Sequence, residues 1–232
     1  MKNILDEVPG HNLSGRLLAS VEFVDDSDLK NKVALDIGCG YGWCELNFLS
    51  RGVTKVVGVE RSEKDLETIQ KNISNDRLEL KVSSATNLPF EANSFDTIVS
   101  WEVIEHIPQG TEKMMFSEVA KVLRPGGAFY LSTPHRSFFT NALDPAWWLA
   151  GHRHYSLKQL DKFAKDTSLL RIEAVKIKGG WWSLFFILNF YISKWVFRRR
   201  PIFETFFSEK ENLEYMVDNG FANIFIKFRK MS

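Results

Sequence analysis

The stretch that most constrains the fold of this chain is VALDIGCGYGWCELNF, residues 33–48. Its first five residues are apolar except for Asp36, which is typical of a strand buried on both faces of a parallel sheet. Gly38, Gly40 and Gly42 follow, and glycine lets a ligand approach the main chain closely. The apolar spacing after the turn predicts a short helix. A strand, a glycine turn and a helix in this order predict a ligand-binding cradle.

Strand-like and helix-like segments alternate after this cradle, which predicts an α/β fold with a Rossmann-like, doubly wound and mostly parallel sheet. The seven expected strands cover residues 33–37, 55–60, 78–82, 95–100, 128–132, 169–177 and 223–229. In such sheets ligands bind at the carboxyl ends of the strands. We therefore look for functional side chains just after each strand.

A length of 232 residues fits one domain, so we expect a single domain over residues 1–232. Within it we expect a cofactor-binding core, a lid and an apolar helical insertion before the last strand, at residues 30–135, 133–155 and 178–222 respectively. Capping-box spacing predicts helix starts at Ser62 with Asp65, Ser156 with Gln159 and Ser208 with Glu211. The R-P-G-G sequence of residues 124–127 predicts a turn.

The charge balance and the cysteines narrow the function. The chain has 30 Lys and Arg against 29 Asp and Glu, and a net charge of +1 gives no electrostatic footprint for nucleic acid. Cys39 and Cys44 lack the second ligand pair of a zinc site, and two reduced cysteines are typical of a cytoplasmic protein. The start of the sequence is too acidic for a signal peptide. We expect a cytoplasmic protein.

Two ligand classes compete for the glycine turn. A dinucleotide fold needs G-x-G-x-x-G, but Trp43 stands at the third glycine position. The pattern D-x-G-x-G-x-G instead resembles motif I of class I S-adenosylmethionine-dependent methyltransferases. Residues 83–107, SSATNLPFEANSFDTIVSWEVIEHI, resemble the block D-A-x-x-L-P-F…F-D-x-V…x-E-x-x-E-H-I of the same family. The resemblance covers about residues 30–135 and implies S-adenosylmethionine as the cofactor.

The resemblance also implies the cofactor contacts. Glu60 ends the second strand, where a carboxylate can accept hydrogen bonds from both ribose hydroxyls. Ser84 stands where the family commonly has Asp, so the adenine contact is expected to rest partly on the backbone of the next two residues. Trp101 is expected near the sulfonium, with ordinary core packing as the alternative. The expected contacts are Asp36, Gly38, Gly40, Gly42, Glu60, Arg61, Ser84, Ala85, Thr86 and Trp101.

Two histidines are the candidate catalytic bases. His106 follows the fourth strand and His135 the fifth, and histidine titrates near neutral pH. A loop histidine without a catalytic role is the alternative for each. Glu102, Glu105 and His106 form E-x-x-E-H, which resembles the ubiquinone/menaquinone-biosynthesis methyltransferase branch, where similarly placed residues have been linked to a divalent metal. The E-H pair is widespread in relatives without metal, so we expect no metal site.

The lid and the insertion are rich in aromatic residues. The lid residues expected to line the acceptor site are Trp147, Trp148, His152, Arg153, His154 and Tyr155, with a packed connection as the alternative. In residues 181–200 a helix places Ser183, Asn189, Ser193 and Lys194 on one arc and apolar residues on the rest. At roughly 1.5 Å per residue, this segment is marginal for spanning a bilayer. It predicts either an interfacial helix at a membrane or a helix that roofs the site or forms a dimer contact.

The combined patterns predict a methyltransferase that uses S-adenosylmethionine and modifies a small, apolar or lipid-linked acceptor, with O-methylation favoured. A non-catalytic cofactor-binding or membrane-scaffolding protein is the alternative, and a nicotinamide-dependent oxidoreductase is disfavoured by Trp43. The expected partners are a small molecule or lipid and, through residues 181–200, the inner face of a membrane. The sequence does not determine the oligomeric state or the acceptor.

Overall fold

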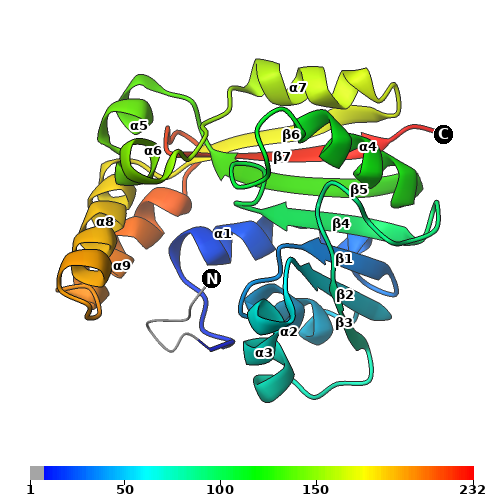
Figure 1. Ribbon diagram of the computed structural model, residues 1–232, viewed down its shortest axis with the longest axis horizontal. Helices are drawn as coiled ribbons and strands as arrows, with labels where there is room; N and C mark the ends of the chain where they lie inside the picture. The colour runs from blue at the N-terminus through cyan, green and yellow to red at the C-terminus, as the bar shows by residue number, and fades with distance from the viewer. Residues whose placement is uncertain (1–7) are drawn as a thin grey trace.

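The computed structural model describes residues 8–232 and contains a seven-stranded sheet in the order β3-β2-β1-β4-β5-β7-β6, with helices on both faces (Figure 1). The strands are β1 Val33–Ile37, β2 Lys55–Glu60, β3 Leu78–Val82, β4 Phe95–Trp101, β5 Leu123–Pro134, β6 Leu170–Lys178 and β7 Asn223–Lys230. The helices are α1 Gly15–Phe23, α2 Trp43–Ser50, α3 Glu63–Asn72, α4 Glu112–Val122, α5 Phe138–Leu143, α6 Pro145–Ala150, α7 Leu157–Asp166, α8 Trp181–Tyr191 and α9 Glu204–Tyr215, with short turns η1 Asp26–Asp28 and η2 Ile192–Val196. The predicted α/β class is confirmed.

The strand directions identify the functional edge of the sheet, which is the one at the carboxyl ends of the parallel strands. Strands β1 to β5 pair in parallel, whereas β7 lies antiparallel between β5 and β6. The carboxyl ends of the parallel strands therefore share one edge. Helices α5, α6, α8 and α9 gather beyond this edge, at the left of Figure 1, with α1 beside them. Ligands of doubly wound sheets bind at this edge.

Each face of the sheet has its own apolar core. Leu35 and Ile37 of β1 pack in a cluster with side chains of α4 and α7. Ala34, from the other face, packs in a second cluster with side chains of α1, α2 and α9. Because strand residues alternate between faces, Asp36 points to the same side as Ala34, toward α2. The alternation thus carries an acid into the second core, directly below the glycine turn.

Local patterns predicted most element boundaries, with three differences. Ser156 and Gln159 form the predicted capping box at α7. Ser62 directly precedes α3 as predicted, but its hydroxyl donates to the Asp65 carboxylate at 2.8 Å and caps no backbone group. The prediction of a helix start at Ser208 was wrong, because α9 begins four residues earlier at Glu204.

The third difference is at the R-P-G-G sequence. Residues 124–127 are a bulge inside β5, since Leu123 pairs with Phe95 and Ala128 pairs with Thr97 on β4. A Cβ on Gly127 would lie 2.7 Å from the backbone oxygen of Asp96, so the bulge needs glycine to pass close to β4. The predicted turn therefore lies within a longer strand.

The insertion before β7 folds as two helices. Helix α8 continues without a break into η2, one turn with π-helical hydrogen bonding. Helix α9 returns and packs against both α8 and α1. Within residues 8–232, no helix combines the length and the apolar character that crossing a membrane requires.

Candidate active site

The glycine turn lies between β1 and α2 and is held to the next strand. The N–H groups of Gly38 and Cys39 donate to the carbonyl of Val59 at 2.9 and 3.2 Å. Gly40 has a φ of +56°, and a Cβ built there meets no atom within 4 Å. Its open side is therefore space in which a ligand can approach the backbone.

Glu60 reaches across this turn from the end of β2. Its Oε1 accepts the Gly40 N–H at 2.9 Å, and its Oε2 accepts the Arg61 N–H at 3.2 Å. A carboxylate has about four lone-pair positions, so acceptor capacity remains for two ribose hydroxyls. The carboxylate and the open side of Gly40 together fit the ribose of S-adenosylmethionine. The Arg61 side chain is exposed at the rim of this turn.

A second acid, which the sequence reasoning missed, lies below the turn. Glu45 of α2 is fully buried, and its carboxyl lies beside Gly58, where a Cβ would be 2.8 Å from Oε1. Gly58 is the register partner of Asp36 on β1, so the two acids are neighbours. The helical spacing gave a signal, because Glu45 lies three and four residues before the buried Phe48 and Leu49.

Burial controls the protonation of this acid pair. Both Glu45 oxygens and Asp36 Oδ1 are buried without a hydrogen-bond donor among residues 8–232. Burial, reinforced by the charge of Glu60, raises the pKa of Asp36 to about 7, and burial beside Asp36 raises the pKa of Glu45 well above its usual range. The two acids below the glycine turn therefore retain their protons to higher pH than exposed carboxyls do.

The remaining expected cofactor contacts are placed as follows. Ser84 is exposed just after β3, and its hydroxyl lies 2.9 Å from the Thr86 hydroxyl and accepts the Thr86 N–H at 3.3 Å. Ala85 is buried between them. The Trp101 indole packs against Phe225 in the second core, and its buried N–H has no acceptor among residues 8–232. Its contact with the methionine part of the cofactor stays a prediction.

Glu102 connects four elements at the end of β4. Its carboxylate accepts the Ser132 hydroxyl of β5 at 2.8 Å and the Asn223 amide of β7 at 2.9 Å. Arg16 of α1 forms an ion pair with it at 2.6 Å. Glu102 has a φ of +56°, a backbone conformation that is costly for glutamate and persists only when the surroundings impose it. These contacts hold α1 over the functional edge.

The acids of the E-x-x-E-H motif are bonded to protein groups. Glu105 is buried and accepts the Thr133 hydroxyl at 3.0 Å, and burial, with the charge of Glu102, raises its pKa well above the usual range. Within residues 8–232 no group of three or more His, Cys, Asp or Glu side chains could hold a metal ion.

His106 is paired with a second imidazole from the lid. The rings of His106 and His152 meet edge to face, with centroids 4.3 Å apart. Burial, with the charges of Arg16 and Arg153, lowers the pKa of His106. Burial, with the charge of His106, lowers the pKa of His152 to about 4. Both rings are therefore neutral at pH 7 and can accept protons.

His135 is the first residue after β5. Its Nδ1 lies 3.4 Å from the Phe221 carbonyl, and a carbonyl only accepts, so Nδ1 carries the proton and Nε2 is the basic nitrogen. Burial lowers the pKa of His135, opposed in part by that carbonyl. The two predicted bases thus follow β4 and β5, which are neighbouring strands.

Three other lid residues that were expected to line the acceptor site make hydrogen bonds within the protein. His154 is buried between Asn141 at 2.8 Å and Asp144 at 2.9 Å, so it holds the lid together. The hydroxyl of buried Tyr155 donates to Glu112 at 2.9 Å. Arg153 donates to the carbonyls of residues 104 and 107. For these three residues the contacts favour the alternative of a packed connection, because the lid uses these polar side chains for its own attachment.

The tryptophans of the lid differ from each other. Trp147 packs on the buried His154 ring at a centroid distance of 4.8 Å, whereas Trp148 is exposed on the surface. His152, beside His106, is the lid residue that the structure brings to the functional edge.

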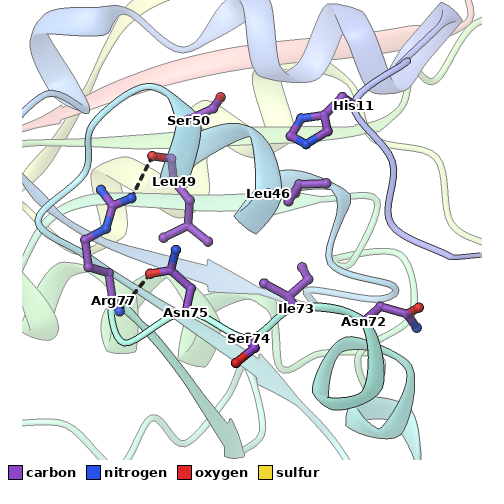
Figure 2. A pocket seen from close by; sticks show the side chains of 9 residues that line it. All are labelled: His11, Leu46, Leu49, Ser50, Asn72, Ile73, Ser74, Asn75 and Arg77. Atoms are coloured by element: carbon purple, nitrogen blue, oxygen red, sulfur yellow. Dashed lines mark hydrogen bonds between the residues drawn. The ribbon is translucent and has the colours of Figure 1, made fainter.

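A cavity of about 340 Å³ lies between α2 and the end of α3. Leu46 and Leu49 of α2, Ile73 at the end of α3 and His11 line it, as Figure 2 shows. Arg77 borders it and donates to the Leu49 carbonyl at 3.1 Å. The cavity contains none of the expected cofactor contacts.

Comparisons with known proteins agree with this geometry. Residues 34–127 match a family model described as a methyltransferase domain. This part of the chain, 94 of its 232 residues, is therefore similar to a methyltransferase domain.

Two individual proteins also resemble part of the chain. The chain is 30% identical over 110 residues to a probable S-adenosylmethionine-dependent methyltransferase of Mycolicibacterium smegmatis, covering 47% of this chain and 41% of that protein. It is 30% identical over 112 residues to the ubiquinone biosynthesis O-methyltransferase of Coxiella burnetii, covering 47% of each. The chain therefore matches less than half the length of these relatives.

A solved structure extends the likeness of the fold. Phosphoethanolamine N-methyltransferase 2 of Haemonchus contortus, determined in complex with S-adenosyl-L-methionine, superposes with a TM-score of 0.69 at 21% identity. The match covers 96% of this chain and 55% of that one. At this identity the likeness concerns the fold, which includes the lid and the insertion.

Proposed function

We propose that the protein transfers a methyl group from S-adenosylmethionine to a small apolar or lipid-linked acceptor, with a hydroxyl oxygen as the favoured methylation site. The observation that carries the proposal is the neutral imidazole of His135, which has its basic nitrogen at Nε2 and directly follows β5. An alcohol or phenol must lose a proton when its oxygen is methylated, and a neutral imidazole can take it.

The chain's own residues bind, orient and exclude water. When bound, S-adenosylmethionine supplies an electrophilic methyl group on a positively charged sulfur. Glu60 and the open side of Gly40 would hold its ribose, and the ion pair between Glu102 and Arg16 keeps α1 over the edge. Orientation and exclusion of water are the main contributions that a protein makes to such a transfer.

Aromatic side chains beside His135 support an apolar acceptor. Phe139 of α5, Trp181 of α8 and Phe221 form a cluster with ring centroids 4.7 to 5.5 Å apart. The Phe221 carbonyl is the group that orients His135. An acceptor that reaches the imidazole from this side meets aromatic surface, which favours an apolar molecule.

The test uses cofactor with an isotopically labelled methyl group. The purified protein is incubated with lipid and aqueous extracts, and mass spectrometry identifies molecules that gain the label. We expect a labelled apolar product, and a lower yield with both His135→Gln and Glu60→Ala. Cofactor binding without any labelled product would support the non-catalytic alternative, and a labelled polar product would refute the apolar acceptor.

A further inference from the structure

An apolar stripe runs along the exposed side of α8 and η2. It consists of Trp181, Phe185, Leu188, Ile192 and Trp195, which follow one another at intervals of four and three residues and so lie on one helix face. Their exposed fractions are 42%, 47%, 41%, 41% and 62%. Five large apolar side chains in a row on one exposed face are typical of a binding surface.

The polar arc of the same helix points inward. Ser183 and Ser193 are fully buried and Lys194 is 7% exposed, so the sequence-derived arc faces the protein. The Glu214 carboxylate of α9 accepts the N–H groups of Trp182 and Ser183 and the Ser183 hydroxyl, each at 2.9 Å. These bonds fix the rotation of α8, and the apolar stripe faces outward as a consequence.

A basic tip continues the stripe at residues 196–203. Arg198, Arg199 and Arg200 are all exposed, flanked by Phe197 at 55% and Phe203 at 74% exposure. The Arg199 guanidinium lies 5.1 Å from the Phe197 ring centroid. Between residues 181 and 203 the sequence has four basic residues and no acidic one. The apolar stripe therefore ends in a concentrated positive charge.

The other end of the stripe leads to the candidate active site. Trp181 contacts Phe139 of α5 with ring centroids 4.7 Å apart, and Phe139 contacts Phe221 at 5.5 Å. Phe138, beside it, is 81% exposed, so α5 extends the apolar surface. Because Phe221 also orients His135, the surface continues to the predicted base. Figure 1 places α5 and α8 next to each other beyond the sheet.

We propose that the apolar stripe and the basic tip dock the protein on an anionic membrane surface, with α8 lying in the plane of the interface. Charge complementarity selects this partner, since tryptophan and phenylalanine insert at the headgroup boundary while arginines pair with anionic lipid. The 16 residues of α8 and η2 extend roughly 24 Å, which is short of a bilayer core of about 30 Å.

Docking in this orientation places the path by which the acceptor reaches the candidate active site next to the membrane. An apolar acceptor dissolved in the membrane reaches His135 past Trp181 and Phe139 without crossing water. This route depends on the proposed function, whereas the docking itself does not. The cytoplasmic leaflet is the anionic one, so the inner face of the membrane is the expected location.

The experiment is co-sedimentation of the full chain with vesicles of phosphatidylcholine alone or mixed with phosphatidylglycerol, at low and high salt. One variant, Phe185→Ser/Leu188→Ser/Ile192→Ser, makes the stripe polar, and its control is Met114→Ser, an equally exposed apolar residue on α4. A second variant changes Arg198, Arg199 and Arg200 to Gln, and its control changes the exposed Lys158, Lys162 and Arg171 to Gln.

We expect the parent and both controls to sediment with anionic vesicles, more at low salt than at high salt. The stripe variant should lose at least tenfold in vesicle affinity at both salt concentrations. The arginine variant should lose its preference for anionic lipid. Calorimetric binding of S-adenosylmethionine should be equal in all five proteins, which verifies folding and keeps a failure of docking distinct from a failure of the proposed function.

Three results would overturn the proposal. The first is a folded, cofactor-binding parent that stays in the supernatant with both vesicle types. The second is equal loss of sedimentation in the controls and the variants. The third is a parent dimer in light scattering that the stripe variant converts to a monomer without any vesicle binding, since the stripe would then be an interface between two copies of the chain.

Discussion

Replacement of Glu60 by Gln tests the cofactor site most directly. Gln keeps the length of the side chain and an oxygen that can accept the Gly40 N–H, now accepted at 2.9 Å, so the glycine turn should keep its shape. The change removes the negative charge and replaces one acceptor by a donor. Both ribose hydroxyls then compete for one remaining oxygen.

The expected loss follows from the strength of such bonds. A hydrogen bond to a charged group contributes about 1.5–3 kcal/mol, and one such bond is lost or two are weakened. Each 1.4 kcal/mol is a tenfold change in affinity, so the Kd for S-adenosylmethionine should rise about 10- to 150-fold. Glu60→Ala, which removes both acceptors, should cost at least as much binding free energy, about 3 kcal/mol.

Isothermal titration calorimetry with S-adenosylmethionine and its demethylated product measures this loss. Glu79→Gln is the matched control, because Glu79 is an exposed carboxylate on the neighbouring β3 that pairs with Lys55 at 2.5 Å. Its Kd should equal that of the parent, and urea unfolding should show that both variants are folded. An unchanged Kd in folded Glu60→Gln would refute the role of Glu60.

Three other perturbations test the remaining parts of the site. Burial raises the pKa of Asp36 from its ordinary value of 3.8 to about 7, so the folded state binds more protons than the unfolded state between these pH values. The stability to urea should therefore fall as the pH rises from 5 to 7. The fall should be at most about 1.4 kcal/mol per pH unit for each proton. Glu45→Gln should flatten this slope, and stability that rises with pH in the parent would contradict the raised pKa values of the two acids. His135→Gln should reduce methyl transfer at least tenfold at an unchanged Kd for the cofactor, and because burial lowers the pKa of His135, the acid limb of the parent's pH–rate profile should lie below pH 6.5. Gly40→Ala should weaken cofactor binding, whereas Gly110→Ala, which also has a positive φ and open space, should cost the same roughly 1–2 kcal/mol of stability without changing the Kd.

The lengths and types of the elements follow from local sequence. The strand β2 has the predicted bounds, because its apolar run is bounded by turn residues. The capping box of Ser156 and Gln159 formed as predicted, since all its groups lie within one turn of helix. The same local logic failed at Ser208, whose hydroxyl lies 3.1 Å from the hydroxyl of Ser14, the residue before α1, in the folded protein. A residue distant in sequence was the better partner there.

The candidate site divides in the same manner. The glycine turn and Glu60 were predictable because their spacing after two adjacent parallel strands brings them together. The partners of Glu102 were not, because Arg16, Ser132 and Asn223 come from three distant segments. The pairing of His106 with His152 also depends on how the lid folds back over β4.

By itself, the sequence determined the α/β class, the cofactor cradle and the positions of the two predicted bases after β4 and β5. The reason is that hydrophobic periodicity and the succession of elements along the chain can be read from the sequence. Only the tertiary structure decided which face of α8 points toward the protein and which points toward solvent. The polar arc of α8 could equally have faced water, but Glu214 binds the start of the helix and fixes its rotation. Burial likewise raised the pKa values of Asp36 and Glu45, since a pKa depends on neighbours that only the folded chain supplies.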